Sequence, residues 1–261
     1  MKRVDHPLFP YYRFDSLSVR TDILHFVSSS ARDIGFSDLN KPVNTYANRC
    51  VLATAVGFRP EQWVLGQQVH SSHVAIVDER DCGRGVKERE SRLPETDALI
   101  TDRTGICLMV MAADCVPLLL YDPVRRVIAA VHAGWRGTAA GIAGKTVRCM
   151  IENLGCRGEN ILAGIGPSIG KCCFEVGAEV AEIFCSHFDS PQGILEIAVS
   201  KPGKYRVDLW EANRRDLVRN GVKQEHIEIS GWCTCCHPED FFSYRYQGEK
   251  AGRFGAGILM K

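Results

Sequence analysis

The sequence has no long hydrophobic run, and this absence limits where the protein can act. None of its apolar stretches approaches the ~20 consecutive residues that a membrane-spanning helix needs. The first seven residues, Met-Lys-Arg-Val-Asp-His-Pro, carry two positive charges but are followed by no apolar segment. They lack the pattern of a secretory signal peptide, so we expect a cytoplasmic protein without a membrane partner.

An excess of charge of either sign is also missing. The formal net charge is +1, with 24% charged and 45% hydrophobic residues, which is typical of an ordinary globular protein. No strongly basic face is implied, so nucleic acid is not an expected partner. The 261 residues can bury a substantial core, and no repeat, low-complexity tract or linker divides them. We therefore expect residues 1–261 to form one domain.

Short apolar runs typical of strands follow one another along the chain, and only three or four segments have helical spacing. Residues 136–154 form the strongest helical pattern, with Gly155 at the position where a helix ends. Asp208 and Glu211 predict a capping box at the start of another helix, and residues 241–244 predict a core strand. This mixture predicts an α+β fold, a single layered domain with mixed β-sheets flanked by helices.

The centre of the chain predicts a buried hairpin. Two apolar runs, residues 118–121 and 127–131, are separated by the turn signal Asp122-Pro123. Cys115 stands before the first run and His132 follows the second. Because these two ends meet in an antiparallel hairpin, the thiol and the imidazole are expected to come within reach of each other. Such a pair can be half of a metal site or a thiolate–imidazole couple.

His70 extends this pair to a possible ligand set. His70, Cys115 and His132 each lie at a predicted strand end beside small or polar residues. Three ligands of His and Cys type, with a fourth position left for water, have the composition of a catalytic zinc site. The alternative is that both histidines are hydrogen-bonded loop residues and the cysteine is a core thiol. The separation of His70 from the hairpin in sequence leaves both interpretations open.

Arg136 lies at the head of the long helical pattern, in Ala-Gly-Trp-Arg-Gly-Thr. A glycine-flanked helix start with an adjacent arginine can bind an anion such as phosphate or a carboxylate. The alternative is that Arg136 pairs with an acidic neighbour.

The chain contains twelve cysteines. Without a secretory signal it needs no disulfide framework, so most are expected to be small buried hydrophobic residues. The run Cys233-Thr-Cys-Cys-His-Pro-Glu suggests a zinc knuckle, but its spacing does not by itself complete four ligands. Cys233, Cys235 and His237 would bind a metal only with help from elsewhere, and thiols in a turn are the expected state.

Motifs spread from about residue 60 to the end of the chain resemble, in content and order, the YfiH family, also described as the multicopper polyphenol oxidase or laccase-domain family. They are Gln68-Val69-His70, Thr96-Asp97-Ala98, Ala113-Asp114-Cys115-Val116-Pro117, Val131-His132-Ala133-Gly134-Trp135-Arg136-Gly137, Gly166-Pro167-Ser168-Ile169-Gly170, Cys172-Cys173-Phe174-Glu175-Val176-Gly177, Asp208-Leu209 and Phe241-Phe242-Ser243-Tyr244-Arg245. Together they are far more specific than any one spacing.

The resemblance implies a layered α+β fold and a Zn²⁺ ion, or alternatively Cu²⁺, bound by His70, Cys115 and His132. It implies phosphorolysis of adenosine, inosine or methylthioadenosine, and deamination of adenosine. Cys115, His132 and Arg136 are the expected catalytic residues. The residues expected to bind substrate or phosphate are Gln68, Arg136, Gly137 and Arg245, so Arg136 is expected to serve in both roles. The expected partners are a purine nucleoside and phosphate, and we expect a monomer or a homodimer.

The N-terminal part departs from the family pattern. The family's S-T-R-x-G-G loop is replaced by residues 27–35, and its N-L-G segment by residues 38–42. If this loop shapes the substrate pocket, the choice of substrate can differ here.

Three other functions remain open. A copper oxidase acting on phenols could use the His₂Cys set, but a trinuclear copper cluster needs H-x-H pairs, and the eight histidines form none. A Cys/His hydrolase acting in cell-wall precursor editing would use Cys115 as nucleophile and His132 as base. A non-catalytic metal-binding protein would have no open coordination position. The H-x-E…P-C-x-x-C signature of the zinc deaminases is absent.

Overall fold

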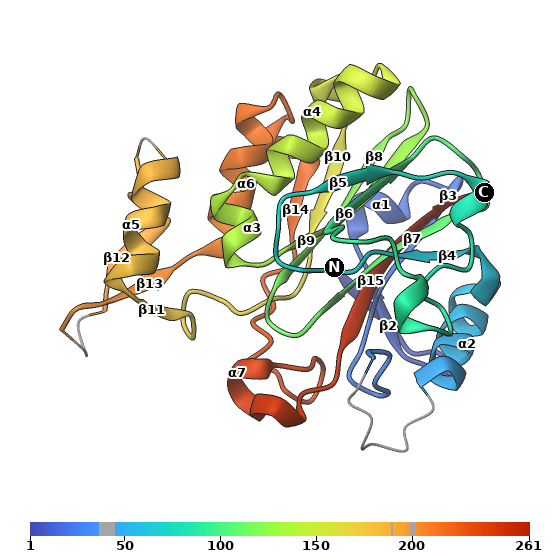
Figure 1. The fold of residues 1–261 in the computed structure, drawn as a ribbon, viewed down its shortest axis with the longest axis horizontal. Coiled ribbons are helices and arrows are strands. Elements are labelled where there is room, and N and C mark those ends of the chain that lie inside the picture. Colours follow the sequence, from blue (N-terminus) through green and yellow to red (C-terminus); the bar gives the residue numbers. More distant parts are fainter. Residues whose placement is uncertain (37–44, 189, 199–201) are drawn as a thin grey trace.

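The fold is taken from a computed structural model that describes residues 1–36, 45–188, 190–198 and 202–261 (Figure 1). Part of the divergent N-terminal segment, residues 38–42, lies outside the described residues. The described part of the chain contains no helix that is both long and apolar enough to cross a membrane.

The first sheet joins the two ends of the chain. Its strands are antiparallel except that β4 runs parallel to β7. In spatial order they are β1 (Lys2–Val4), β2 (Tyr11–Arg13), β3 (Ile23–Ser28), β15 (Phe254–Met260), β7 (Cys107–Ala112) and β4 (Trp63–Leu65).

The second sheet contains the central hairpin. It is mixed, because β10 and β14 pair in parallel and so do β5 and β6, whereas the other pairs are antiparallel. In spatial order its strands are β14 (Ile227–Ile229), β10 (Leu162–Ile165), β8 (Val116–Asp122), β9 (Val127–Ala133), β6 (Ala98–Thr101) and β5 (Val74–Ile76). A small antiparallel sheet consists of β11 (Glu175–Gly177), β13 (Lys204–Val207) and β12 (Leu195–Ile197).

The helices of the described residues are α1 (Asp15–Ser18), α2 (Thr45–Val56), α3 (Trp135–Ala139), α4 (Ile142–Leu154), α5 (Ala178–His187), α6 (Leu209–Arg219) and α7 (Tyr244–Gln247). Of these, α2 packs on the outer face of the first sheet, and α3, α4 and α6 pack on the outer face of the second. Short 3₁₀ turns occupy Pro60–Gln62, Glu79–Asp81, Arg89–Ser91, Gly158–Asn160, Gln224–His226 and Gly248–Lys250. In Figure 1, α4 and α6 lie together on one side, α2 lies at the opposite edge, and α5 accompanies the small sheet.

Alternation of side chains along the strands produces the layers. Leu119 of β8 faces the first sheet, where it shares a core with Leu108 and Ile258, while the neighbouring Leu118 faces the helix layer. Because successive strand residues point to opposite faces, strands buried on both faces need continuous apolar runs, and β8 and β9 are buried throughout. The layered α+β fold with mixed sheets and flanking helices is thereby confirmed.

Two of the predicted elements are wrong in detail. The helix predicted over residues 136–154 is two helices, α3 and α4, because Gly141 between them has a φ of +72°, which no α-helix accommodates. The strand predicted over 241–244 is a loop followed by α7, which begins where Ser243 accepts a hydrogen bond from the N–H of Tyr246 at 3.2 Å. The aromatic residue Phe241 is nevertheless fully buried.

The cap predicted at Asp208 is confirmed on one side only. Its carboxylate accepts a hydrogen bond from the N–H of Glu211 at 3.0 Å and so begins α6. The side chain of Glu211 turns instead to the guanidinium groups of Arg214 and Arg215, at 2.7 and 2.6 Å. Gly155 ends α4 in the left-handed conformation, as the sequence predicts.

A candidate metal centre and the cavity around it

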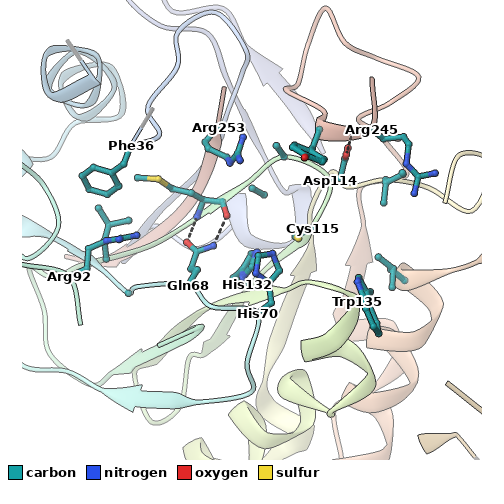
Figure 2. Close-up of a pocket in the computed structure, with 18 of the residues that line it drawn as sticks. Phe36, Gln68, His70, Arg92, Asp114, Cys115, His132, Trp135, Arg245 and Arg253 are labelled. Carbon is teal, nitrogen blue, oxygen red and sulfur yellow. Dashed lines mark hydrogen bonds between the residues drawn. The ribbon is translucent and has the colours of Figure 1, made fainter. Parts of the chain in front are cut away.

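The central hairpin brings the predicted ligands together. β8 and β9 pair antiparallel with Pro117 opposite His132, so Cys115, just before β8, lies beside the end of β9. His70 reaches them from the loop between β4 and β5. One ligand atom from each of the three residues lies within 4.8 Å of the others, and the two imidazole rings are 5.0 Å apart between centroids. Figure 2 shows the three side chains converging at one side of a cavity.

Asp97, at the start of β6, holds both histidines in place. Its Oδ1 lies 2.8 Å from Nδ1 of His132 and accepts a hydrogen bond from the backbone N–H of His70 at 3.1 Å. Its Oδ2 accepts bonds from the N–H groups of Val69 and Ser71 and from the Ser71 hydroxyl. His70 has a φ of +62°, an unusual conformation for a residue other than glycine, and these bonds to the loop maintain it.

The same carboxylate sets the orientation of the His132 ring. Because a carboxylate accepts hydrogen bonds, Nδ1 of His132 carries the proton and Nε2 is left for the other members of the trio. Burial opposes ionisation of Asp97, but the bonds from His132 and Ser71 hold its pKa below the ordinary value. A buried carboxylate behind a histidine is a common support for metal-binding imidazoles.

The charges of Cys115 and His132 stabilise each other. Burial alone would raise the pKa of the Cys115 thiol, yet His132 and His70 lower it to about 6. Burial would lower the pKa of His132, yet Cys115 and Asp97 raise it to about 9. Each group therefore favours the charged form of the other, the thiolate of Cys115 and the imidazolium of His132. The thiolate is the form of cysteine that binds metals and attacks electrophiles.

Two backbone features let the trio come together. A Cβ atom on Gly134 would lie 2.7 Å from Cδ2 of His70 and 3.2 Å from Sγ of Cys115, so only glycine fits here without displacing both side chains. Asp114, before Cys115, has a φ of +92°. Its side chain is held by the hydroxyl of Thr234 at 2.7 Å and by the N–H of Arg245 at 2.6 Å. Such strained backbone persists only where surrounding contacts maintain it.

The trio opens into a cavity of about 590 Å³. Its wall combines apolar and aromatic side chains with several guanidinium groups. The lining residues include Phe36, Leu65, Met111, Trp135, Ile169, Phe174, Leu209 and Tyr244, together with Arg89, Arg92, Arg245 and Arg253. A concave, mostly apolar site with a few converging charged groups is the usual form of a small-molecule site.

Two of the predicted binding residues line this cavity, and both already have protein partners. The side-chain amide of Gln68 donates to the carbonyl of Met111 at 2.7 Å and accepts from its N–H at 2.8 Å, the two bonds dashed in Figure 2. One terminal nitrogen of Arg245 donates to the carbonyl of Cys173 at 2.8 Å, and the guanidinium lies 5.8 Å from the ring centroid of Phe174. Gln68 therefore fixes the edge of β7, whereas Arg245 fixes the loop that follows β10.

The other two predicted binding residues are not among the described residues that line the cavity. Arg136 is exposed, and its guanidinium stacks 4.2 Å from the ring centroid of Trp135. Among the residues that the structure describes, no acidic side chain pairs with it. Gly137 is buried where a Cβ atom would lie 2.8 Å from the carbonyl oxygen of Ser71, so it serves the close approach of α3 to the His70 loop. The guanidinium of Arg136 therefore does not line the cavity, although Gly134 at the start of the same helix lies against His70 and Cys115.

Sequence reasoning missed Asp97 and three of the arginines. Asp97 stands just before a buried strand, and an acidic residue there, inside a motif, is a signal that could have identified it. Arg89 and Arg92 belong to the charged segment 79–95, which has the composition of a solvated loop and gives no signal. Arg253 precedes β15, and the sequence around it likewise does not identify it as a site residue.

Comparisons with known proteins agree with this architecture. The family model described as "Multi-copper polyphenol oxidoreductase laccase" matches residues 27–261. A protein of Bacteroides thetaiotaomicron named purine nucleoside phosphorylase is 37% identical over 260 residues, which cover 95% of each chain. A protein of an unknown prokaryotic organism named adenosine deaminase RL5 is 41% identical over 216 residues, which cover 82% of this chain and 80% of that protein.

Solved structures give the same assignment. The crystal structure of the Bacillus licheniformis hypothetical protein YfiH superposes with a TM-score of 0.92 at 30% identity and covers 99% of this chain and 98% of that one. YlmD from Geobacillus stearothermophilus gives a TM-score of 0.91 at 30% identity, covering 100% and 98%. The chain belongs to the YfiH family, whose family model is described as a multi-copper polyphenol oxidoreductase laccase.

Proposed function

We propose that this protein is a metal-dependent purine nucleoside phosphorylase that also deaminates adenosine at the same site. The observation that carries the proposal is the trio of His70, Cys115 and His132 facing a cavity with aromatic and guanidinium walls. Relatives named purine nucleoside phosphorylase and adenosine deaminase support it. The proposed substrates are adenosine, inosine and methylthioadenosine together with phosphate.

The residues present fit a single Zn²⁺ ion. Two imidazoles and one thiolate, with one side facing a cavity, have the donor set of a catalytic rather than a closed structural zinc site. Asp97 behind His132 leaves Nε2 of that ring for the ion. When bound, Zn²⁺ would supply Lewis-acid polarisation of an oxygen atom or of a water. A single Cu²⁺ ion is the alternative occupant, but no further histidine cluster among the described residues offers a place for a trinuclear copper centre.

The arginines on the wall suggest where phosphate binds. Burial and the neighbouring Arg89 lower the pKa of Arg92, so two cations lie close together in the part of the cavity near Phe36. An anion between them would relieve their repulsion, and guanidinium groups suit phosphate because they bind it bidentately. We assign phosphate to Arg92 with Arg89 or Arg253 in place of Arg136, which lies outside the cavity.

In phosphorolysis, a phosphate oxygen forms a bond to C1′ of the ribose while the glycosidic bond breaks. The electron pair of that bond leaves with the purine, which takes up a proton, and the products are the free base and ribose 1-phosphate. The ribose passes through an oxocarbenium-like state, so an anion held on one face of the sugar stabilises it. The aromatic residues Phe36, Trp135 and Phe174 offer surfaces on which the purine can pack.

A cysteine hydrolase is the second candidate, and one observation favours it. Cys115, His132 and Asp97 are arranged as nucleophile, base and orienting acid, with the pKa of the thiol lowered to about 6. In that reaction the thiolate would attack the carbonyl carbon of an amide, the C–N bond would break, and the amine would leave with a proton from His132. Water would then hydrolyse the thioester, releasing the carboxylic acid and regenerating the thiol. A metal bound to Cys115 would occupy the nucleophile, so the two candidates exclude each other at this residue.

Product analysis separates these activities. Protein purified without chelator is incubated with adenosine in the presence and absence of phosphate, and the products are resolved by chromatography. Adenine and ribose 1-phosphate formed only with phosphate support the phosphorylase, and inosine formed without phosphate supports the deaminase. His73→Gln serves as the control, because His73 is an exposed histidine of the same loop outside the trio. Turnover of neither kind by metal-containing protein would contradict the proposal.

A further inference from the structure

Four thiols gather at a second place, apart from the trio. Cys172 and Cys173 lie in the loop between β10 and β11, and Cys233 and Cys236 lie in the turn after β14. All four sulfur atoms lie within 4.8 Å of one another. The twelve cysteines of the chain are free, so none of these sulfurs belongs to a disulfide.

The spacing of the sulfurs suits a tetrahedral metal ion. Sγ of Cys236 lies 3.6 Å from that of Cys172 and 3.4 Å from that of Cys173. Four sulfurs at the usual Zn–S distance of about 2.3 Å stand roughly 3.8 Å apart, whereas a disulfide needs about 2.05 Å. These two separations are close to those in a zinc tetrathiolate and far too long for a disulfide, and the other sulfurs also lie within 4.8 Å of one another.

The backbone is built to hold the two segments together. Ser168 pairs with Cys233 in a parallel bridge, and the N–H of Thr234 donates to the carbonyl of Ser168 at 3.0 Å. The N–H of Gly170 donates to Sγ of Cys233 at 3.2 Å, a bond that stabilises a thiolate. A Cβ atom on Gly170 would lie 3.1 Å from Cβ of Cys233 and 3.2 Å from Sγ of Cys172, so this glycine admits the close approach.

We propose that Cys172, Cys173, Cys233 and Cys236 bind a structural Zn²⁺ ion, separate from any ion held by His70, Cys115 and His132. Four cysteines complete the coordination of zinc and leave no position for water, which is the mark of a structural site. The C-x-x-C spacing of 233–236 supplies one half of the site and the adjacent pair 172–173 the other. Cys235 and His237, the neighbours of Cys236, are not among the four proposed ligands.

The site would fix one wall of the cavity. The loop that carries Cys172 and Cys173 continues into Phe174, which lines the cavity, and the carbonyl of Cys173 receives a hydrogen bond from Arg245. Thr234, inside the C-x-x-C turn, donates to the carboxylate of Asp114 beside Cys115. An ion here would tie together two segments that meet only through tertiary contacts and would hold the cavity wall against the hairpin.

Metal content is the direct test. Full-length protein is purified under reducing conditions without chelator or added metal, and zinc is measured by mass spectrometry for wild type, Cys233→Ser and the double variant C172S/C236S. We expect wild type to carry one zinc per chain more than either variant. The double variant changes exposed thiols and therefore tests the site even if replacing the buried Cys233 prevents folding. The matched control is Cys235→Ser, which should retain the full metal content.

A spectroscopic measurement identifies the ligands. In the Cys115→Ala background, Co²⁺ added to metal-depleted protein should give the intense thiolate charge-transfer and visible bands of a tetrahedral thiolate site. Introducing Cys233→Ser into the same background should abolish these bands.

Equal zinc content in wild type and in both variants would overturn the proposal. The proposal would also be overturned if wild-type protein is isolated without metal and its intact mass is two hydrogens below the expected value until a reductant is added. That result would show a disulfide in place of the ion.

Discussion

The carboxylate of Asp97 lies 2.8 Å from Nδ1 of His132, and both side chains are almost fully buried. The same carboxylate binds three successive N–H groups of the loop that carries His70. The Asp97 side chain thus sets the geometry of two of the three candidate ligands, although it is not itself one of the three. The candidate centre depends as much on this support as on the ligands themselves.

Asp97→Asn is expected to weaken metal binding at the trio by about 10- to 100-fold, the usual effect of losing a carboxylate behind a ligating histidine. The amide is uncharged and no longer stabilises a charged His132, and it accepts the three loop N–H bonds less strongly. The measurement is the dissociation constant for Zn²⁺ by competition with a chromophoric chelator. Asp102→Asn, at an exposed position after β6, is the control. Unchanged affinity in Asp97→Asn would show that the carboxylate does not support the metal.

Arg92→Gln and Arg136→Gln decide where phosphate binds. A charge-assisted bond to phosphate contributes about 1.5–3 kcal/mol, so Arg92→Gln should raise the KM for phosphate by about 10- to 100-fold. Arg136→Gln should leave that KM within about twofold, because its guanidinium stacks on Trp135 outside the cavity. The KM for phosphate is measured at saturating adenosine. The opposite ranking would restore the anion site at the start of α3.

His25 makes stability depend on pH. Burial, with a smaller contribution from the charge of Arg13, lowers its pKa from 6.5 to about 3. Inside the protein, Nε2 of His25 accepts a hydrogen bond from the N–H of Phe14 at 3.0 Å. The unfolded chain binds a proton here below pH 6.5 and the folded chain does not. The stability contributed is therefore complete above pH 6.5 and is lost as the pH falls from 6.5 towards 3.

Between pH 7 and pH 5 this loss amounts to about 2 kcal/mol. Urea unfolding at both pH values should show that His25→Gln, which can still accept a hydrogen bond, loses less stability on acidification than wild type by about this amount. His73→Gln, which changes an exposed histidine, should behave like wild type. An identical pH dependence in wild type and His25→Gln would contradict the assignment.

The hairpin and half of the candidate centre could be predicted from the sequence, because local rules govern them. Two apolar runs around Asp122-Pro123 specify an antiparallel pair, and that pairing places Cys115 beside His132 whatever the rest of the fold does. The contact with His70 depends on the packing of a distant loop against β6 and has no local signature. The residue pattern named His70 as a possible third ligand but left its contact open, and the family resemblance then implied that contact.

The remaining misses have physical causes of the same kind. The four thiols belong to two segments whose meeting depends on the parallel bridge between Ser168 and Cys233, so the sequence offers only an adjacent pair and an isolated C-x-x-C. The break at Gly141 was hidden because a glycine in an apolar helical pattern does not by itself end a helix. Arg92 lies in a charged loop whose composition is that of any solvated segment.

The proposed metal-dependent site is tested by comparing wild type with Cys115→Ala in one experiment that measures zinc content and turnover of adenosine with phosphate. We expect the variant to contain one zinc per chain fewer than wild type and to form neither adenine nor ribose 1-phosphate, while wild type forms both. The difference of one ion is expected whether or not the four-thiol site is occupied. Equal zinc in the two proteins, or full nucleoside turnover by the variant, would contradict the assignment of Cys115 as a metal ligand needed for turnover.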